Sequence, residues 1–385
     1  MVKIDLAKAF DRIEWDFIVK VLARKGLHGH FINLIYACMA IPTFSVIING
    51  QSYGRFQSSR GIRQGCPLSP YLFVLAINEL SISLQEAMLA DHLSGIILGT
   101  GCPPIHSLMF ADDLLICGQA TVDEATHMLQ ILQRFCNLSG QMPNWSKSAI
   151  IFSRNVNAIN KEGIKRIFPV QDISDSSIYL GHPLILPDKD RSSAYDFVAD
   201  KFKVKLTGYK ANKLSHAARL TLINSVFASI PVYYMSNILF SRKLIAKLTS
   251  IIRNFWWTGI KEDPSKKALC LRAWKDICTP KVEGGLGIKN IQAVNRGLIL
   301  SAAWRIAEEP QSFLSQVLKS KYFPDTSIWR AKNNIPKSGF WASILKVKHI
   351  LYANSIYQIL DGNSSVWSTP WFPHWQSIYE HLQIR

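Results

Sequence analysis

Two adjacent carboxylates, Asp112 and Asp113, lie between two short apolar runs. The runs cover residues 105–110 and 114–117, and each is typical of a short buried strand, so the pair is predicted at the tip of a hairpin. Two like charges at such a turn destabilise each other unless a cation lies nearby. Taken alone, an acidic pair of this kind indicates an ordinary β-turn, and the assignment of chemistry depends on the rest of the sequence.

A third carboxylate, Asp5, ends the apolar segment 2–6, which is also predicted to be a strand. If this strand neighbours the hairpin, the three carboxylates meet at one edge of a sheet. Hard oxygen donors of this type suit Mg²⁺, which binds a few carboxylates together with phosphate oxygens. Two such ions stabilise the attacking and leaving oxygens of an in-line phosphoryl displacement.

The elements that must position these carboxylates are of mixed type. Helical apolar spacing and period-two alternation alternate along the first 190 residues. The sequence predicts helices over 14–22, 29–39, 70–89 and 121–138, a strand over 147–152, and a hairpin of 44–48 with 51–56 around Asn49-Gly50. Residues 178–185 are predicted to be a short strand or a turn. This order predicts an α+β fold in which an antiparallel sheet is covered on one face by helices.

The positive charge of the chain is concentrated in one segment. Of a formal net charge of +17, residues 201–300 contribute +14, from 18 Lys and Arg against 4 Asp and Glu. Apolar spacing predicts helices over 190–207, 217–227 and 242–253. A block of one sign favours binding to a polyanion, of which a nucleic-acid backbone is the commonest.

Bulk composition excludes several other classes of protein. The chain has 385 residues, enough for two or three domains, and a hydrophobic content of 48% excludes a disordered chain. Seven Cys without a CxxC pair predict neither disulfides nor a structural zinc site. No signal-peptide core and no unbroken apolar run of 18 residues is present in the sequence. We therefore expect an intracellular protein of the nucleus or cytoplasm, not secreted and without a membrane partner.

Five segments in order resemble the polymerase motifs A to E of reverse transcriptases, specifically those of non-LTR (LINE-type) retrotransposons of the plant type. They are Lys3–Asp11, Arg63–Pro70, Phe110–Asp113, Ser139–Ser148 and, more weakly, Tyr179–Leu184. The resemblance covers residues 1 to about 185. It implies a polymerase palm over 1–188, a helical basic thumb over 189–255, and a small, mainly helical connector over 256–385.

The resemblance implies RNA-directed DNA synthesis from dNTPs on a DNA primer and an RNA template. Asp5 and Asp112 would bridge two Mg²⁺ ions, with Mn²⁺ as a substitute, and Asp113 would support them as a third metal-site carboxylate. Lys147 would be the general acid for the pyrophosphate leaving group. Its alternative role is that of a solvated lysine at the start of a strand.

Four further residues would contact the incoming nucleotide and the template. Phe10 occupies the place of the family's steric gate against a ribose 2′-hydroxyl, although a core phenylalanine is an equal alternative. Arg63, Gln64 and Gly65 would line the nucleotide path. The alternative for Arg63 is an ordinary surface arginine. Asp11 is predicted to be a helix N-cap rather than a metal ligand.

Primer and template contacts are expected in two places. The motif E segment would supply a primer grip of Tyr179, Leu180 and Gly181. The thumb would grip the nucleic-acid backbone through Lys201, Lys203, Lys205, Lys210, Lys213 and Arg219. The aromatic residues 255–257 and Trp274 are predicted to be core residues, with base stacking as the alternative. Asp361-Gly362 is predicted to be a hairpin turn.

In this family a fingers region that holds the triphosphate precedes motif A, and here four residues precede Asp5. We therefore expect the metal carboxylates to be intact and turnover to be low, as in a retroelement truncated at both ends. The alternative function is that of a non-catalytic nucleic-acid-binding remnant or a maturase-like RNA binder.

Overall fold

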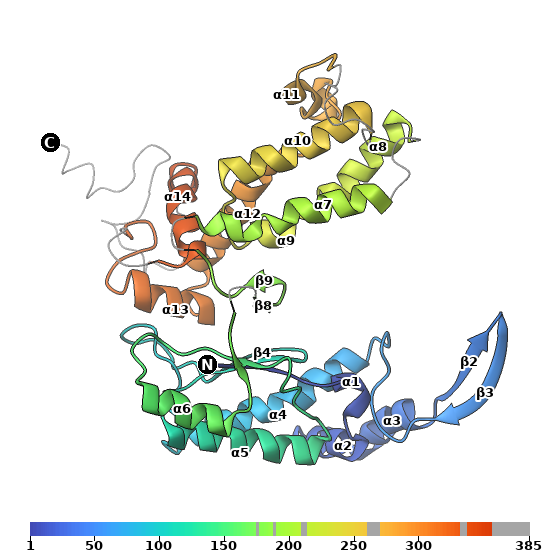
Figure 1. Ribbon diagram of the computed structural model, residues 1–385, viewed down its shortest axis with the longest axis vertical. Coiled ribbons are helices and arrows are strands. Elements are labelled where there is room, and N and C mark those ends of the chain that lie inside the picture. The colour runs from blue at the N-terminus through green and yellow to red at the C-terminus, as the bar shows by residue number, and fades with distance from the viewer. Residues whose placement is uncertain (175–176, 188–189, 209–213, 260–269, 332–336, 356–385) are drawn as a thin grey trace. The chain divides into compact units, whose positions relative to one another are not determined.

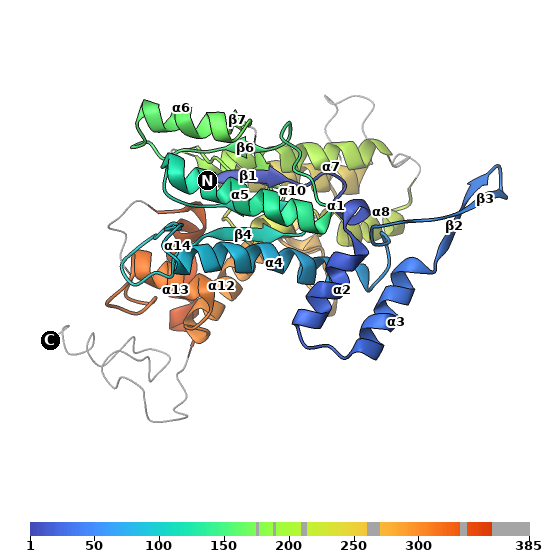
Figure 2. The ribbon, with the colours of Figure 1, turned by 90° about the horizontal axis from the view of Figure 1, so that it is seen from below.

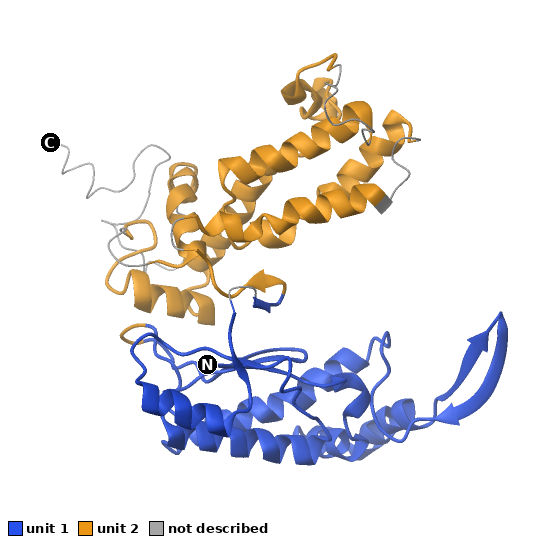
Figure 3. Cartoon of the chain, viewed as in Figure 1, with its two compact units in different colours: residues 1–98, 102–180 blue, residues 99–101, 181–385 orange. Residues whose placement is uncertain are grey.

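The computed structural model describes residues 1–355 apart from 175–176, 188–189, 209–213, 260–269 and 332–336. The chain divides into two compact units, coloured separately in Figure 3. Unit 1 consists of residues 1–98 and 102–180, and unit 2 of residues 99–101 and 181–385. The two units meet in the sequence between residues 180 and 181, and the palm boundary expected at residue 188 stays a prediction. The turn expected at Asp361-Gly362 lies outside the described residues.

Unit 1 is an α+β structure, as predicted from the sequence. Its elements are β1 (Val2–Asp5), α1 (Ala9–Arg12), α2 (Trp15–Arg24), α3 (Gly29–Ala40), β2 (Thr43–Ile48), β3 (Gln51–Gln57), α4 (Ser69–Leu89), β4 (Ser107–Phe110), β5 (Asp113–Ile116), α5 (Val122–Ser139), β6 (Ala149–Ile150), α6 (Ala158–Ile167), β7 (Gln171–Asp172) and β8 (Ile178–Tyr179). The main sheet has the order β4-β5-β1-β6-β7, antiparallel except for the parallel pair of β6 and β7.

Helices α2, α4, α5 and α6 lie on one face of this sheet (Figure 1), and Figure 2, viewed from that side, shows α4 and α5 in front of β1 and β4. The burial of β1 alternates, so that Val2 and Ile4 face the core while Lys3 and Asp5 are directed to the other face. Helix α4 is long and apolar enough to cross a membrane by those two criteria alone. In this unit its residues Leu80 and Leu84 are fully buried in the core.

The hairpin of β2 and β3 extends away from the main sheet, and nearly all its residues are exposed. Its turn has positive φ at both Asn49 (49°) and Gly50 (82°), which is the type I′ geometry predicted from this pair.

Unit 2 is mainly helical. Its elements are β9 (His182–Pro183), η1 (Arg191–Tyr195), α7 (Phe197–Gly208), α8 (His216–Leu222), the π-helical segment η3 (Ile223–Phe227), α9 (Val232–Met235), α10 (Arg242–Thr258), α11 (Trp274–Ile277), η4 (Lys281–Glu283), α12 (Ile291–Glu308), α13 (Phe313–Tyr322) and α14 (Gly339–Ala353). One hydrophobic cluster includes buried residues from Tyr195 to Ile291, and a second includes residues from Ile299 to Val347.

The boundary expected between thumb and connector at residue 255 falls inside α10. Phe255 and Trp256 are buried in the first of these clusters at 1% and 7% exposure, and Trp257 and Trp274 pack against it. The aromatic residues at the end of α10 therefore belong to the core, which confirms that prediction, and the cluster joins the expected thumb to the region after it.

Candidate active site

The pairing of β1 with β5 brings two of the predicted metal carboxylates to the same level of the sheet. The strands are antiparallel, and Asp5 is the direct partner of Asp113. Directly opposite residues in such a pair have their Cβ atoms about 4.5–5.5 Å apart. Residues that are 108 positions apart in the sequence thus meet at one end of two neighbouring strands, which is the condition stated above for the carboxylates to converge.

The turn between β4 and β5 consists of Ala111 and Asp112, since Phe110 is paired with Asp113. Ala111 has a φ of 52°, a left-handed conformation that costs an alanine about 1–2 kcal/mol. Backbone strain of this kind is common at functional sites. It places Asp112 at the tip of the hairpin, where its side chain is exposed, beside the less exposed Asp113.

The Asp113 carboxylate is partly buried and lies among other charges. Burial raises the pKa of Asp113, the Lys3 ammonium opposes this increase, and the negative charges of Asp112 and Asp5 raise the pKa further. The three carboxylates are therefore close enough to repel one another. A bound cation would relieve that repulsion.

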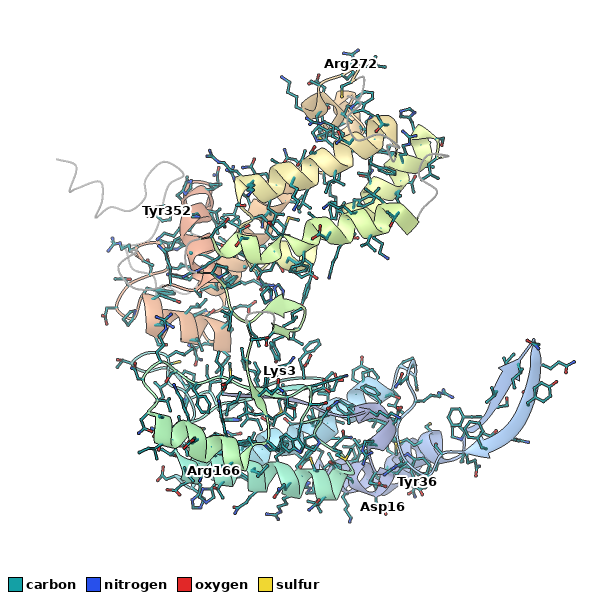
Figure 4. The ribbon with its side chains drawn as sticks, in the orientation of Figure 1. Lys3, Asp16, Tyr36, Arg166, Arg272 and Tyr352 are labelled. Carbon is teal, nitrogen blue, oxygen red and sulfur yellow. The ribbon has the colours of Figure 1, made fainter. Side chains whose placement is uncertain are left out.

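Lys3 is a residue of this site that was not predicted from the sequence (labelled in Figure 4). Its Nζ lies 3.7 Å from Asp113 Oδ1 and donates a hydrogen bond to Ile178 O at 2.7 Å. The spacing of Lys3 and Asp5 in the sequence indicated this position. Residues i and i+2 of a strand lie on the same face of a sheet, so Lys3 and Asp5 must share one.

The loop before β6 is attached to the same end of β1. Asn144 N donates to Asp5 O at 2.7 Å, and Asp5 N donates to the buried Ser148 Oγ at 3.2 Å. Strand β6 pairs with β1 through Val2 with Ile150 and Lys3 with Ala149. Lys147 is exposed in the turn between Asn144 and Ser148, the two residues that bond to the backbone of Asp5. The strand predicted over 147–152 is shorter, covering only Ala149–Ile150, because the preceding residues form a turn.

Phe10 lies on α1, shortly after Asp5 in the sequence. Its ring stacks on that of Phe73 with a centroid distance of 4.9 Å and an interplanar angle of 15°. Phe73 is 1% exposed, whereas Phe10 is only partly buried at the edge of the core. The ring therefore packs against the core while remaining partly accessible, and its role as a steric gate stays a prediction.

Asp11 was predicted to be a helix N-cap, and this prediction is wrong. Helix α1 begins at Ala9 with Lys8 as its N-cap, and the next helix, α2, has Glu14 as its N-cap. Asp11 lies inside α1, and its Oδ1 accepts a hydrogen bond from Gln64 Nε2 at 3.3 Å. The carboxylate thus links the motif A and motif B segments.

Backbone contacts hold the same two segments together. Ile62 N donates to Phe10 O at 2.7 Å, and Gly61 N donates to Ile13 O at 2.8 Å. Gly61 has a φ of 86°, and a Cβ at this position would lie 2.7 Å from Asp11 O. Only glycine satisfies both conditions, which explains the residue type at this position.

A cavity of about 500 Å³ lies between these segments and the base of the β2–β3 hairpin. Its lining includes Asp11, Arg63, Gln64 and Cys66, of which all but Cys66 are exposed. Gly65 is exposed beside them with a φ of 84°, and a Cβ there would meet no atom within 4 Å. The three residues predicted to line the nucleotide path are therefore accessible to a ligand.

Cys66 is a second residue of interest that was not predicted. A hydrogen bond from the Leu68 backbone lowers the pKa of the Cys66 thiol, with smaller contributions from Ser69 and Arg63. The sequence places Cys66 just before the long helix α4. Unpaired amide groups at the start of a helix stabilise a thiolate, so this position could have indicated a reactive cysteine.

Strand β8 lies close to the carboxylates within unit 1. Ile178 O accepts the hydrogen bond from Lys3, and burial, followed by the charge of Asp113, raises the pKa of Tyr179. Leu180 and Gly181 follow with φ values of 48° and 75°. Of the expected primer grip, Tyr179 and Leu180 belong to unit 1 and Gly181 to unit 2.

The basic residues expected to grip primer and template fall into three groups. Lys201, Lys203 and Lys205 are exposed on α7; Lys201 donates to Tyr234 Oη at 2.6 Å, and Lys203 pairs with Asp200 at 2.9 Å. Lys210 and Lys213 lie outside the described residues. Arg219 is 9% exposed and donates from Nη1 to Trp256 O at 3.1 Å. It therefore lies inside unit 2, not on the surface where a phosphate contact was expected.

Comparison with known proteins shows to which family the chain belongs. The family model described as reverse transcriptase (RNA-dependent DNA polymerase) matches residues 1–184. The chain is 32% identical over 145 residues to an uncharacterized mitochondrial protein of Arabidopsis thaliana, of which it covers 92%. It is 30% identical over 204 residues to the Pol polyprotein of the type-1 retrotransposable element R2 of Popillia japonica, with 51% of this chain and 28% of that protein covered.

The chain belongs to the reverse transcriptase family. Its relatives among the R2 elements place it with the non-LTR retrotransposon enzymes. It is also 33% identical over 159 residues to a putative ribonuclease H protein of Arabidopsis thaliana, covering 41% of this chain and 25% of that protein. The chain thus spans about a quarter of the length of these two longer relatives.

Reverse transcriptases generally use divalent metal ions, and the carboxylates of this domain are the residues that could bind them. Within the described residues no three His, Cys, Asp or Glu side chains are grouped as a metal site. Mg²⁺ is usually held by only one or two carboxylates, the remaining ligands being water and substrate phosphates. The opposed Asp5 and Asp113, with the adjacent Asp112, supply oxygen donors of this type.

Proposed function

We propose that this reverse transcriptase domain extends a DNA primer on an RNA template using dNTPs, with two Mg²⁺ ions held by Asp5, Asp112 and Asp113. The observation that carries the proposal is the register of β1 and β5, which sets Asp5 opposite Asp113 beside the strained turn that carries Asp112. When bound, the ions supply charge stabilisation for the attacking and leaving oxygens. Mn²⁺ has similar oxygen preferences and would substitute.

The remaining residues of the site act on the nucleotide itself. Lys147, exposed in the turn between Asn144 and Ser148, would donate a proton from Nζ to the pyrophosphate leaving group, a contribution of about 10²–10⁴ in rate. Arg63, Gln64 and Gly65 would line the nucleotide path. Phe10, held by its stacking on Phe73, would exclude a ribose 2′-hydroxyl.

Primer extension tests the catalytic role of the carboxylates. The full chain is assayed on poly(rA)–oligo(dT) with Mg²⁺ and dTTP. We expect Asp112→Ala to abolish incorporation. Asp16→Ala, which removes an exposed carboxylate of α2 in the same unit, should leave incorporation unchanged. Equal incorporation by wild type and Asp112→Ala, or none by either, would contradict the proposal.

Sugar selectivity tests the role of Phe10 separately. In Phe10→Val the side chain no longer reaches the sugar, so rNTP incorporation should rise relative to dNTP incorporation. Val74→Ala removes an exposed apolar side chain of α4 and serves as the control. An unchanged ratio in Phe10→Val would show that the ring has only a packing role.

A second function, nucleic-acid binding without catalysis, is favoured by one observation: residues 201–300 carry +14 of the net charge. Binding that depends on phosphate contacts weakens steeply with salt. If Asp112→Ala and wild type bind a primer–template equally well, both lose binding as salt rises, and neither extends the primer, the chain is a binder and not a polymerase.

A further inference from the structure

Unit 2 contains a cavity of about 590 Å³ that none of the polymerase motifs lines. Its walls are supplied by η1, by the segment between α9 and α10, and by helices α10, α12 and α14 (Figure 1). All of these lie beyond the residues that match the reverse transcriptase family model. Sites for nucleotide-sized ligands have volumes of about 300–1,000 Å³, so the cavity is large enough for such a molecule.

Part of the cavity wall is held in one conformation by hydrogen bonds to three other elements. The consecutive backbone N–H groups of residues 239–241 donate to Ser343 Oγ at 2.9 Å, Asn295 Oδ1 at 2.8 Å and Ser192 Oγ at 2.8 Å. These three side chains are 3%, 1% and 5% exposed. A wall that is fixed before the ligand arrives lowers the entropic cost of binding.

The charge around the cavity is almost all positive. Five of its lining residues are Lys or Arg, and one, Asp190, is acidic. Arg242, Arg296 and Lys346 are exposed and form no ion pair within the described part of the chain. Arg191 Nη1 donates to Lys337 O at 2.5 Å, which fixes one edge of its guanidinium. Cations from four different elements thus converge on one concave surface.

We propose that this cavity binds a phosphate-bearing ligand of nucleotide size, supplied either as a free nucleotide or as the terminal nucleotide of a nucleic-acid strand. Arginine presents a planar set of donors that matches phosphate oxygens, and lysine adds a mobile point charge. Ile245, Val347 and Ile350 give the same cavity an apolar wall against which a base or sugar can pack. The inference does not depend on the carboxylates of unit 1.

The test measures nucleotide binding under conditions in which the polymerase site does not contribute. The full chain carrying Asp112→Ala is titrated in EDTA with trinitrophenyl-ATP, and binding is followed by fluorescence. We expect Arg296→Ala/Lys346→Ala to raise the Kd about tenfold, because two charge-assisted phosphate contacts are lost. Lys243→Ala/Arg253→Ala removes one Lys and one Arg from exposed positions of α10 that do not line the cavity. This control should change the Kd less than about twofold.

Competition then separates the two sources of the phosphate. If a strand end is the ligand, a 5′-phosphorylated pentanucleotide displaces the probe at lower concentration than ATP or the same strand with a 5′-hydroxyl. If a free nucleotide is the ligand, ATP displaces the probe best. Absence of probe binding, or an equal loss in the two double variants, would overturn the inference. Failed primer extension with cavity-dependent probe binding would refute the proposed function alone.

Discussion

Lys3 is expected to stabilise the sheet around the carboxylates of Asp5 and Asp113. Its Nζ lies 3.7 Å from Asp113 Oδ1, a separation that corresponds to about 4 kcal/mol at an effective dielectric constant near 20. The two side chains are 17% and 30% exposed, so solvent reduces the net contribution to about 1 kcal/mol. The hydrogen bond to Ile178 O adds about 1 kcal/mol. Lys3→Met should therefore lower the free energy of unfolding by about 1–2 kcal/mol.

A double-mutant cycle at pH 7, measured by urea unfolding followed by circular dichroism, isolates the ion pair from the other contacts of Lys3. We expect a coupling free energy of about 1 kcal/mol between Lys3→Met and Asp113→Asn, because the neutral amide no longer needs a cation. Lys20→Met removes an exposed charge of α2 and should have no measurable effect. A coupling indistinguishable from zero would refute the electrostatic argument.

The same pair has a pH dependence of definite sign. Because the pKa of Asp113 is raised in the folded state, its ionisation costs stability as pH increases through that pKa. Removal of Lys3 raises this pKa further. The destabilisation by Lys3→Met should therefore be smaller under acidic conditions, where Asp113 is protonated, than at neutral pH. An effect of equal size at both pH values would assign the loss to the Ile178 hydrogen bond alone.

Three further predictions follow from single positions. Gly61→Ala and Gly65→Ala both place an alanine at positive φ, but only Gly61→Ala also brings a Cβ to 2.7 Å from Asp11 O. Gly61→Ala should therefore lower the free energy of unfolding in urea by about 1–3 kcal/mol more than Gly65→Ala. Equal losses of stability in the two variants would contradict the close contact. The pKa of Cys66 is lowered, whereas burial raises the pKa of Cys136 to about 11. Cys66 should therefore react with iodoacetamide at pH 7.5 well before Cys136. Peptide mass mapping that finds Cys136 modified first would contradict this prediction. Asn295→Leu leaves Phe240 N and the carbonyls of Met235 and Ile238 without their partner, so it should lower the free energy of unfolding by about 3 kcal/mol or more. Gln292→Leu on the same helix is the control and should lower it by less than about 1 kcal/mol. Similar losses in the two variants would show that the buried amide contributes little.

Local signals in the sequence were sufficient for much of unit 1. A type I′ turn requires positive φ at two successive residues, and Asn-Gly is one of the few residue pairs that adopt it readily, so Asn49-Gly50 was a specific signal. Helices α3, α4 and α5 have long apolar faces with clear ends, such as Pro42 after α3 and the N-cap Thr121, which accepts from Glu124 N. The pairing of β1 with β5 was only a condition of the sequence argument, because no local pattern shows which strands are neighbours.

Other features depend on contacts that no local pattern encodes. The position of the Lys3 side chain depends on its ion pair with Asp113, which lies 110 residues away in the sequence. The position of the Arg219 side chain depends on its hydrogen bond to the backbone of Trp256. Asp11 was misassigned because its side chain has the chemistry of an N-cap, whereas α1 begins two residues earlier after the left-handed Lys8. Helix α6 was missed because only Ile164 is fully buried along its length. The Ser-capped starts of α13 and α14, at Ser312 and Ser338, were signals that could have been used.

The central position of β1 has a consequence for how the protein is made. Residues 2–5 are flanked by β5 on one side and β6 on the other. On the ribosome this strand has neither neighbour until more than a hundred further residues have been synthesised. Its backbone N–H and C=O groups stay available to other chains during that interval, about 5–30 seconds at 5–20 residues per second. The strand that carries Asp5 therefore stays without its sheet neighbours until most of unit 1 has been synthesised.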